Sequence, residues 1–293
     1  MAGQLKEVRN RIKSVQSTQQ ITKAMKMVSA AKLRRAQDAI VQMRPYAQKL
    51  QELLSNIVSS SEGEVGMTLA TERQVEKVLL IVITSDRGLA GAYNTNLIKL
   101  AKATIVEKYA SQKQKGNVTI WSIGKKGYEH FIKNNYQADA THKDIFLHLT
   151  FENVQKASQA AMKGFEEGKF DVVEIIYSQF KNAATQRFEV ERFLPIPKVQ
   201  KKEGDKKADF IYDPSKEELV AELMPKILNT QLYKAVLDAN ASEHGARMTA
   251  MDKASENANE MLRNLKISYN RARQAAITTE LTEIVSGAAA LQG

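Results

Sequence analysis

The sequence predicts an α/β protein: a long antiparallel coiled coil of the N- and C-terminal helices plus a small Rossmann-like α/β domain. Both ends of the chain have apolar residues at alternating three- and four-residue spacing, which is typical of helices that pack on helices. Residues 76–200 change to short continuous apolar runs that alternate with helical patterns. We expect an N-terminal coiled-coil helix in residues 1–60, a central α/β domain with connectors in 61–212, and a C-terminal coiled-coil helix in 213–293.

Residues 4–58 are predicted to form one helix of roughly 80 Å. This segment has no glycine after Gly3 and a single proline, Pro45, which we expect to loosen or kink the helix locally. Its apolar positions fall into three runs, and the second run implies a phase slip in the packing seam. The runs are Leu5, Val8, Ile12 and Val15; then Ile21, Met25 and Val28; then Ala36, Ile40, Met43, Ala47, Leu50, Leu54 and Ile57.

Residues 215–290 are predicted to form a helix of roughly 110 Å, with Ser215 and Glu218 as its N-terminal cap and box. Its packing seam is the series Leu237, Ala241, His244, Met248, Met251, Ser255, Ala258, Leu262, Leu265, Tyr269, Ala272, Ala276, Thr279 and Glu283. Each long helix needs a partner for its seam, and the other helix is the candidate. Because the helices are unequal, the apolar stretch Ile284–Leu291 extends past its partner, either as a frayed end or as a tip that enters another protein.

The middle of the chain predicts a small parallel or mixed sheet. Buried strands are expected at 78–84, 118–123 and 172–177, with an edge strand at 187–194. Helices are expected at 94–110, 127–134 and 151–168. Pro195–Pro197 and the charged stretch Lys198–Lys207 are expected to form an exposed connector.

Composition limits the possible functions. The absence of cysteine excludes disulfides and thiol chemistry and fits a reducing compartment. With only four histidines, a His-rich metal site is not expected. No apolar stretch approaches the roughly 20 residues that span a bilayer. The first residues do not resemble a secretory signal, so we expect a bacterial-type cytoplasmic location.

The net charge of +10 is concentrated at the N-terminus. Residues 1–49 hold eleven Lys and Arg against two acids, whereas residues 216–293 hold nine basic and ten acidic residues. A charge stripe of this kind attracts an acidic partner, which can be nucleic acid, an acidic protein surface or anionic lipid. Nucleic acid is disfavoured because Tyr46 is the only aromatic residue in residues 1–49. A nucleic-acid-binding protein nevertheless stays an alternative.

Two turns resemble nucleotide-binding loops without matching them. The glycines of Ser85–Gly91 are too close together for a dinucleotide fingerprint, and a phosphate-binding loop around Gly124–Gly127 would need glycine at Thr119 and a hydroxyl residue at Lys126. We interpret both as ordinary strand-to-helix turns, with a small nucleotide-dependent enzyme as the weaker alternative.

The histidines also favour structural interpretations. His142 and His148 flank Asp144, and a surface loop is favoured over a metal site. His244 lies in the predicted seam, where a polar residue that fixes register or meets a partner is favoured over a catalytic residue.

Three long stretches resemble the gamma subunit family of F-type ATP synthases, of the bacterial type. They read IKSVQSTQQITKAMKMV at 12–28, ITSDRGLAGAYN at 83–94 and ITTELTEIVSGAAA at 277–290. The resemblance implies a non-catalytic rotor shaft that turns within a ring of alpha and beta subunits and couples ion flow to ATP synthesis, with no cofactor and no metal. The alternative left by the residues alone is a basic coiled-coil nucleic-acid-binding protein.

The resemblance also implies particular partners and contact residues. Beta-subunit contacts are implied at Lys23, Met25, Lys26, Arg247, Arg273, Gln274, Thr278 and Glu280. A foot on the membrane c-ring is implied at Arg44, Tyr46, Phe210 and Tyr212. The α/β domain is expected to bind the epsilon subunit, with one copy of the chain per complex. The location implied is peripheral, at the cytoplasmic face of the bacterial inner membrane.

Overall fold

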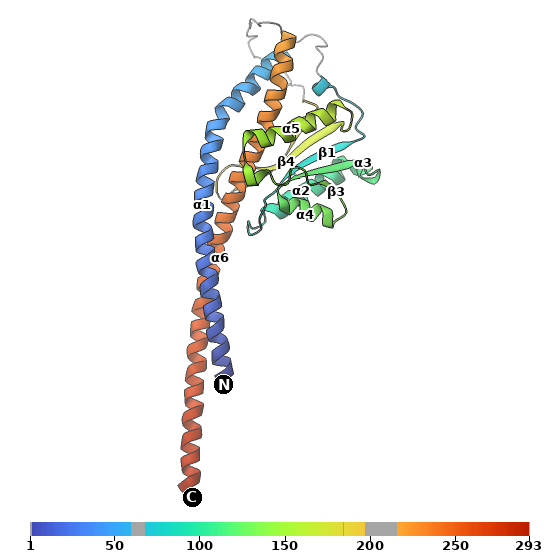
Figure 1. Ribbon diagram of the computed structural model, residues 1–293. Coiled ribbons are helices and arrows are strands. Elements are labelled where there is room, and N and C mark those ends of the chain that lie inside the picture. Colours follow the sequence, from blue (N-terminus) through green and yellow to red (C-terminus); the bar gives the residue numbers. More distant parts are fainter. Residues whose placement is uncertain (1, 60–67, 184, 197–215, 293) are drawn as a thin grey trace. The chain divides into compact units, whose positions relative to one another are not determined.

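The computed structural model describes residues 2–59, 68–183, 185–196 and 216–292 (Figure 1). The chain divides into two compact units. Unit 1 comprises Met1–Ser29 with Met248–Gly293, and unit 2 comprises Ala30–Arg247. Helix α1 (Ala2–Ser59) and helix α6 (Lys216–Gln292) each contribute to both units. The two long terminal helices are therefore confirmed.

Neither proline ends its helix. Helix α1 continues through Pro45, and α6 continues through Pro225. The expected domain limits near residues 60 and 212 fall outside the described residues, as does the connector Lys198–Lys207. Those limits stay a prediction.

Unit 2 contains a five-stranded sheet with the order β3-β2-β1-β4-β5. Strands β1 to β4 pair in parallel, and β5 is antiparallel to β4, so the predicted mixed sheet is confirmed. Central strand β1 lies between β2 and β4, with Val78 opposite both Val118 and Val172. The strands are β1 (Val78–Ile83), β2 (Val118–Ile123), β3 (Gln137–Asp139), β4 (Val172–Phe180) and β5 (Gln186–Leu194).

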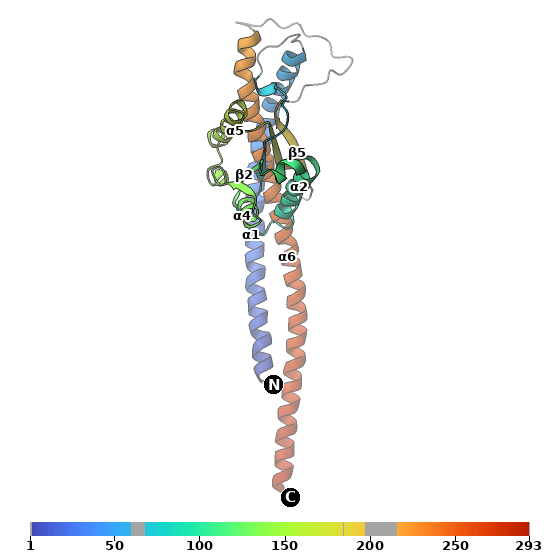
Figure 2. The same ribbon diagram turned by 90° about the vertical axis from the view of Figure 1, so that its right-hand side faces the viewer.

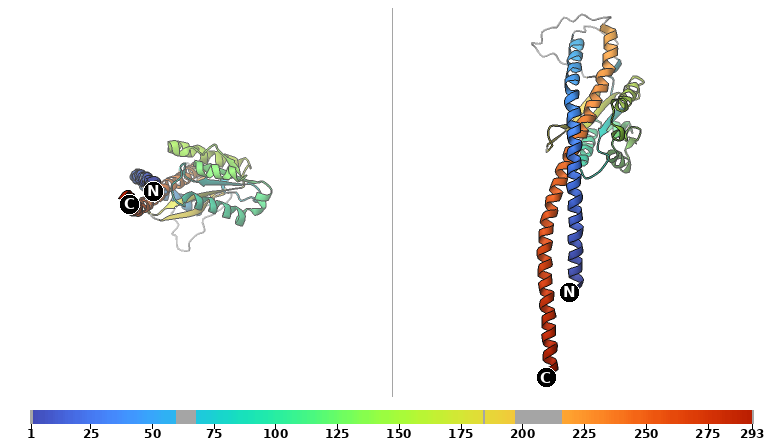
Figure 3. Two further views of the ribbon diagram at one scale, coloured as in Figure 1. Left: turned by 90° about the horizontal axis from the view of Figure 1, so that it is seen from below. Right: turned by 60° about the vertical axis from the view of Figure 1, so that its left-hand side comes forward.

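Both faces of this sheet are covered by helices, which explains the continuous apolar run of β1. Alternate β1 residues face opposite ways: Leu79 belongs to one apolar core and Leu80 to the other. The first core contains α5 (Phe151–Glu166), and the second contains α2 (Tyr93–Lys108) with Phe131 of α4 (Lys125–Lys133). Figures 2 and 3 show the helix layers on the two sides of the sheet.

Helix α6 completes the first core within unit 2. Six of its residues belong to the same buried cluster as the β1 and α5 side chains: Met224, Leu228, Leu232, Ala235, Val236 and Ala239. A fully buried leucine contributes roughly 1.5–3 kcal/mol relative to an exposed one. The C-terminal helix is therefore a core element of the α/β unit as well as a coiled-coil helix.

Several short elements were not predicted. They are strand β3, helix α3 (Ala110–Gln114) and the 3-10 turns η1 (Thr68–Ala70) and η2 (Ile145–His148). Strand β3 has only three residues, which is too short for an apolar alternation to be visible. The helix predicted for 94–110 ends at Lys108 because Tyr109 leaves the helical conformation, with φ −130°.

Candidate partner-binding surfaces

Within unit 1, α1 and α6 lie side by side as antiparallel helices (Figure 1). Polar contacts fix their register, and they span most of the paired length. The contacts are Arg9 Nη2 to Tyr269 OH (2.8 Å), Gln19 to Asn259, Thr22 Oγ1 with Ser255 Oγ (2.7 Å), and Lys26 Nζ to Asp252 Oδ1 (2.5 Å). The predicted antiparallel pairing is confirmed.

The predicted seam of α6 is confirmed within unit 1 and ends sooner than expected. Its buried or half-buried positions are Met248, Met251, Ser255, Ala258, Leu262, Leu265, Tyr269, Ala272, Ala276 and Thr279. The register of the helix pair places Ala276 opposite Ala2, where α1 begins. Glu283, which was predicted to lie in the seam, is exposed because no α1 residue is left to cover it.

The predicted phase slip in α1 is wrong. The side chains of Ile21 and Val28 are 60% and 57% exposed, although both were assigned to the seam. The regular three- and four-residue spacing continues without interruption, but polar residues occupy it: Gln19, Thr22, Lys26 and Ser29. Thr22 and Ser29 are buried. Apolar residues therefore face outward where the seam is polar, which reverses the usual helix amphipathicity.

The first group of predicted contact residues lies beside this reversed segment. Lys23 is exposed, and Met25 is half-buried at the edge of the seam. Lys26 forms an ion pair with Asp252, and both side chains are more than two-fifths exposed. With the neighbouring Met27, which is 67% exposed, these residues offer a partner both positive charge and apolar surface.

The positive charge of α1 is largely uncompensated inside unit 1. Among the described residues between 5 and 29, Lys26 alone is in a salt bridge. Arg9 donates to the neutral hydroxyl of Tyr269 and lies 5.7 Å from the centre of its ring. The remaining cations are exposed: Lys6, Arg11, Lys13 and Lys23. This surface therefore attracts an acidic partner.

The second group of predicted contact residues lies where α6 loses its partner. Arg273, Gln274, Thr278 and Glu280 are all exposed. The Thr278 hydroxyl donates to the Gln274 carbonyl of the preceding turn, at 3.0 Å. Beyond Ala276, four large apolar side chains at helical spacing are 48–67% exposed: Ile277, Leu281, Ile284 and Val285. An exposed apolar stripe of this kind marks a protein-binding surface.

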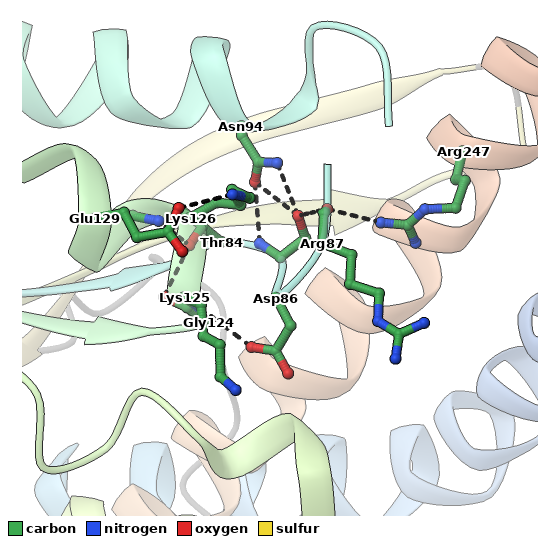
Figure 4. Close-up of polar contacts among 11 residues, drawn as sticks. Thr84, Asp86, Arg87, Asn94, Gly124, Lys125, Lys126, Glu129 and Arg247 are labelled. Atoms are coloured by element: carbon green, nitrogen blue, oxygen red, sulfur yellow. Dashed lines mark hydrogen bonds and ion pairs between the residues drawn. The ribbon is translucent and has the colours of Figure 1, made fainter. Parts of the chain in front are cut away.

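Arg247 is placed differently from the other predicted contact residues. It is only 8% exposed and forms a buried ion pair with Glu243, one helical turn away. Its Nη2 donates to the carbonyl oxygens of Arg87 (2.9 Å) and Gly88 (3.2 Å) in the β1–α2 turn (Figure 4). Burial raises the pKa of Glu243, and the Arg247 charge opposes that rise. Its guanidinium group is thus occupied within unit 2.

The two glycine-containing turns, Ser85–Gly91 and Gly124–Gly127, pack against and hydrogen-bond to other residues of this chain. A Cβ at Gly124 would lie 2.2 Å from the Thr84 carbonyl oxygen, so this glycine is needed for close packing. The first N–H groups of α4 already have acceptors: Asp86 for Lys125, the Ser85 carbonyl for Lys126 and Thr84 Oγ1 for Gly127 (Figure 4). This helix start therefore has no vacant N–H cradle of the kind that binds phosphate.

The crevice beside β1 and β4, where open α/β sheets usually bind ligands, is occupied by α6. Ser178 at the end of β4 shares a 2.6 Å hydrogen bond with Ser242. Tyr93 donates to the Ala239 carbonyl at 3.0 Å. The arrangement agrees with the interpretation of these loops as structural turns.

The histidines lie in structural surroundings. The His142 ring packs on Trp121, with centroids 4.9 Å apart, and Asp144 pairs with Lys125. Within the described part of the chain, no three acidic or histidine side chains group closely enough to hold a metal ion. Burial, and then the charges of Arg247 and Lys32, lower the pKa of His244 to about 4, so its ring is neutral at pH 7.

The predicted foot is described only in part. Arg44 is exposed on α1, and the Tyr46 side chain is 51% exposed. Phe210 and Tyr212 lie outside the described residues. Among the helices as described, none is both long and apolar enough to cross a bilayer.

The fold and its surfaces define a class of protein: an α/β protein with an antiparallel coiled coil that exposes basic and apolar side chains to partners. The family model described as ATP synthase matches residues 4–291. The ATP synthase gamma chain of Cytophaga hutchinsonii is 55% identical over 98% of both chains. That of Flavobacterium johnsoniae is 54% identical over 99% of both. The chain belongs to the ATP synthase gamma chain family.

Solved structures share this fold at lower identity. A chain of the Euglena gracilis mitochondrial ATP synthase, in a structure described as OSCP/F1/c-ring, has a TM-score of 0.68 at 21% identity, covering 99% of this chain and 95% of that one. A second Euglena gracilis structure, described as the rotor, has a TM-score of 0.62 at 20% identity, covering 94% and 100%. These structures share the fold of this chain. Through its family membership the chain is a non-catalytic rotor-shaft subunit, and the nucleic-acid-binding alternative is not supported.

Proposed function

We propose that this chain transmits rotation through two contact zones of unit 1, both directed at the beta subunits of a surrounding alpha–beta ring. The observation that carries the proposal is the reversed α1 segment: its polar residues are in the seam while Ile21 and Val28 face outward. A helix pair that only had to hold itself together would bury these apolar side chains. Their exposure beside a basic stripe fits a partner with apolar and acidic residues.

The first zone consists of Lys23, Met25 and Lys26. Exposed charge pairs contribute only about 0–1 kcal/mol each, so contacts of this kind guide a moving shaft without holding it in one position. Lys26 is shared between Asp252 and solvent, which leaves it available to an acidic partner. A shaft with charge on one side makes different contacts with three beta subunits, and this difference shifts each of them between conformations.

The second zone consists of Arg273, Gln274, Thr278 and Glu280, where α6 is exposed. It combines the permanently charged guanidinium group of Arg273, the amide of Gln274 and the carboxylate of Glu280. Together these groups can donate and accept hydrogen bonds with a polar loop of the beta subunit. The adjacent apolar stripe from Ile277 to Val285 is suited to an apolar sleeve formed by the ring.

The remaining partners follow from family membership. We infer that the chain assembles as one copy per complex, that its α/β domain binds the epsilon subunit, and that Arg44 and Tyr46 lie in the foot on the membrane c-ring with Phe210 and Tyr212. The complex would sit at the cytoplasmic face of the bacterial inner membrane with this chain as a peripheral subunit. Co-purification at one copy per three beta subunits tests the stoichiometry.

The second zone offers the sharpest test of the proposal. The variant Arg273→Ala with Gln274→Ala is expected to lower ATP-driven proton pumping per ATP hydrolysed in the reconstituted complex. The isolated chain should keep its helix content, measured by far-UV circular dichroism, because both side chains are exposed and outside the seam.

Arg263→Ala with Asn264→Ala is the matched control, since it also removes an exposed arginine and an exposed amide from α6. It should leave the pumping ratio unchanged. Normal pumping in the Arg273–Gln274 variant, or an equal loss in the control, would contradict the proposed zone.

A further inference from the structure

The β1–α2 turn, Ser85–Gly91, is held against α6 by a small buried network. Arg247 donates to the carbonyls of Arg87 and Gly88, and Glu243 holds the other side of the guanidinium group. Glu243 and Arg247 are 7% and 8% exposed. A buried carboxylate at this position serves to orient the arginine, because a charge removed from water must be paired.

The turn itself is ordered from the inside by its own polar side chains. Ser85 Oγ donates to the Arg87 carbonyl at 2.6 Å, and the Ser85 N–H donates to Asn94 Oδ1 at 3.0 Å. The Arg87 carbonyl therefore accepts from both the turn and α6, which joins the two elements at one oxygen atom.

The tip of this turn is strained and exposed. Leu89 has φ +63°, a conformation that non-glycine residues rarely adopt, and its side chain is 63% exposed. Strained backbone persists only where the surrounding contacts over-determine it. Arg87 is also exposed, and Figure 4 shows its side chain directed away from the turn while its carbonyl meets Arg247.

We propose that Arg247 is a positioning residue: with Glu243 it latches the β1–α2 turn to α6, so that Arg87 and Leu89 are presented to partners in one orientation. The planar guanidinium group can bind a carboxylate and two carbonyl oxygens at once, which a lysine ammonium on a flexible stem cannot reproduce. Arg247 in this role acts through the turn, which it ties to the stretch of α6 that belongs to unit 2.

The absence of native cysteine makes the latch directly measurable. A Leu89→Cys substitution places a single spin label at the exposed tip of the turn in the isolated full chain. Arg247→Ala and Arg247→Lys are both expected to increase the mobility of this label at least twofold. Glu243→Gln should give a smaller increase, since it keeps the shape of the pair while removing its charge. Arg263→Ala, which removes an exposed arginine of α6, should leave the label unchanged.

The reconstituted complex supplies the second measurement. Arg247→Ala and Arg247→Lys should lower the ratio of proton pumping to ATP hydrolysis to a similar extent, because retaining the positive charge alone does not restore the latch. If Arg247→Ala lowers this ratio while the label in the isolated chain stays immobile, Arg247 contacts a partner directly and the latch is refuted. Rescue of pumping by lysine would refute it as well. Should Arg247→Ala fail to fold, the Arg247→Lys and Glu243→Gln variants decide.

Discussion

Helix α6 is one continuous element, but its two stretches are packed in different ways. In unit 2, nearly every residue from Ile227 to Arg247 is buried or half-buried, because the sheet, its loops and α1 surround the helix. In unit 1, only every third or fourth residue from Ser255 to Ala276 is covered. The same helix is thus a core element in one unit and a single-seam coiled-coil helix in the other.

The chemistry of the two stretches differs in the same way. In unit 2, α6 contributes six apolar side chains to the core, and its polar contacts follow near Ser242 and Arg247, whereas the seam of unit 1 contains hydroxyl, amide and charged pairs along most of its length. Polar seams fix register at a cost in stability. The difference teaches that the fold is stabilised mainly in unit 2, while unit 1 maintains alignment and leaves apolar side chains free for partners.

Matched leucine truncations should show the largest effect. Leu232 in unit 2 is fully buried, and Leu262 in the seam is 8% exposed. Leu232→Ala is expected to lower the free energy of unfolding by about 2–5 kcal/mol, because the surrounding core cannot collapse into the cavity. Leu262→Ala should cost less, about 1–2 kcal/mol, because a two-helix seam can relax. The measurement is a urea titration of the isolated chain.

The single tryptophan, Trp121, makes the two units distinguishable in this experiment. It packs against the core of unit 2, so its fluorescence reports that unit, whereas far-UV circular dichroism reports the helices of both. Leu232→Ala should shift the Trp121 transition and Leu262→Ala should not. Equal shifts in fluorescence would mean that the two stretches unfold as one body and that the contrast between them is wrong.

Substitution of Asp238 should give the next largest change in stability, and this change should be stabilising. It is 2% exposed, and burial raises the pKa of its carboxyl group from the ordinary value of 3.8 to about 6, against the lowering effects of Lys234 and Arg44. A raised folded pKa gives stability that is fully present below pH 3.8 and lost as the pH rises through about 6. Asp238→Asn should therefore stabilise unit 2 by roughly 3 kcal/mol at pH 8.

The pH dependence separates this effect from simple repacking. The advantage of Asp238→Asn should shrink to about zero near pH 4, as the wild-type carboxyl group takes up its proton. Asp252→Asn is the matched control, since this carboxylate is 46% exposed in unit 1. A stabilisation by Asp238→Asn that does not change with pH would exclude ionisation as its cause.

Apolar periodicity was sufficient to predict the α6 seam and failed in part of α1. In α6, small and apolar residues occupy most seam positions, so the spacing alone identified them. In α1, the seam passes through Gln19, Thr22 and Lys26, while Ile21 and Val28 lie outside it. A rule that assigns apolar residues to the interior selects the wrong face at such a point. An uninterrupted heptad count from Val15 would have found the correct one.

The candidate site was predictable where it depends on local sequence. Arg273 and Gln274 are exposed because they lie between the seam positions Ala272 and Ala276, which the three- and four-residue spacing had identified. The burial of Arg247 depends on contacts with Arg87 and Gly88, about 160 residues earlier in the chain. No spacing in a single sequence encodes a contact of that range. The role of the β1–α2 turn was therefore missed.

Substitutions in the hydroxyl pair of the seam should change the stability of unit 1 by about 1 kcal/mol. The sign of this change should depend on whether one hydroxyl group or both are removed. Thr22 and Ser255 are buried and share a 2.7 Å hydrogen bond. Thr22→Val alone should destabilise unit 1 by about 1 kcal/mol, since it removes that bond. Thr22→Val with Ser255→Ala should recover this loss or exceed the wild type, because an apolar pair needs no hydrogen bond. Amide hydrogen exchange of residues 5–29 is the measurement. Additive losses would show that this seam does not behave like an apolar one.

The Lys26–Asp252 pair should give the smallest effect on stability. Its side chains are 42% and 46% exposed, so solvent screens the attraction, and the coupling in a double-mutant cycle is expected to be about 0–1 kcal/mol. Lys26→Ala, Asp252→Ala and the double variant supply that cycle by hydrogen exchange in the isolated chain. In the reconstituted complex Lys26→Ala should still lower the pumping ratio, and Asp252→Ala should not, because only the cation faces the acidic partner. A coupling well above 1 kcal/mol together with normal pumping would mean that this pair stabilises the seam. Lys26 would then not be a beta-subunit contact, and the first contact zone would be wrong at this residue.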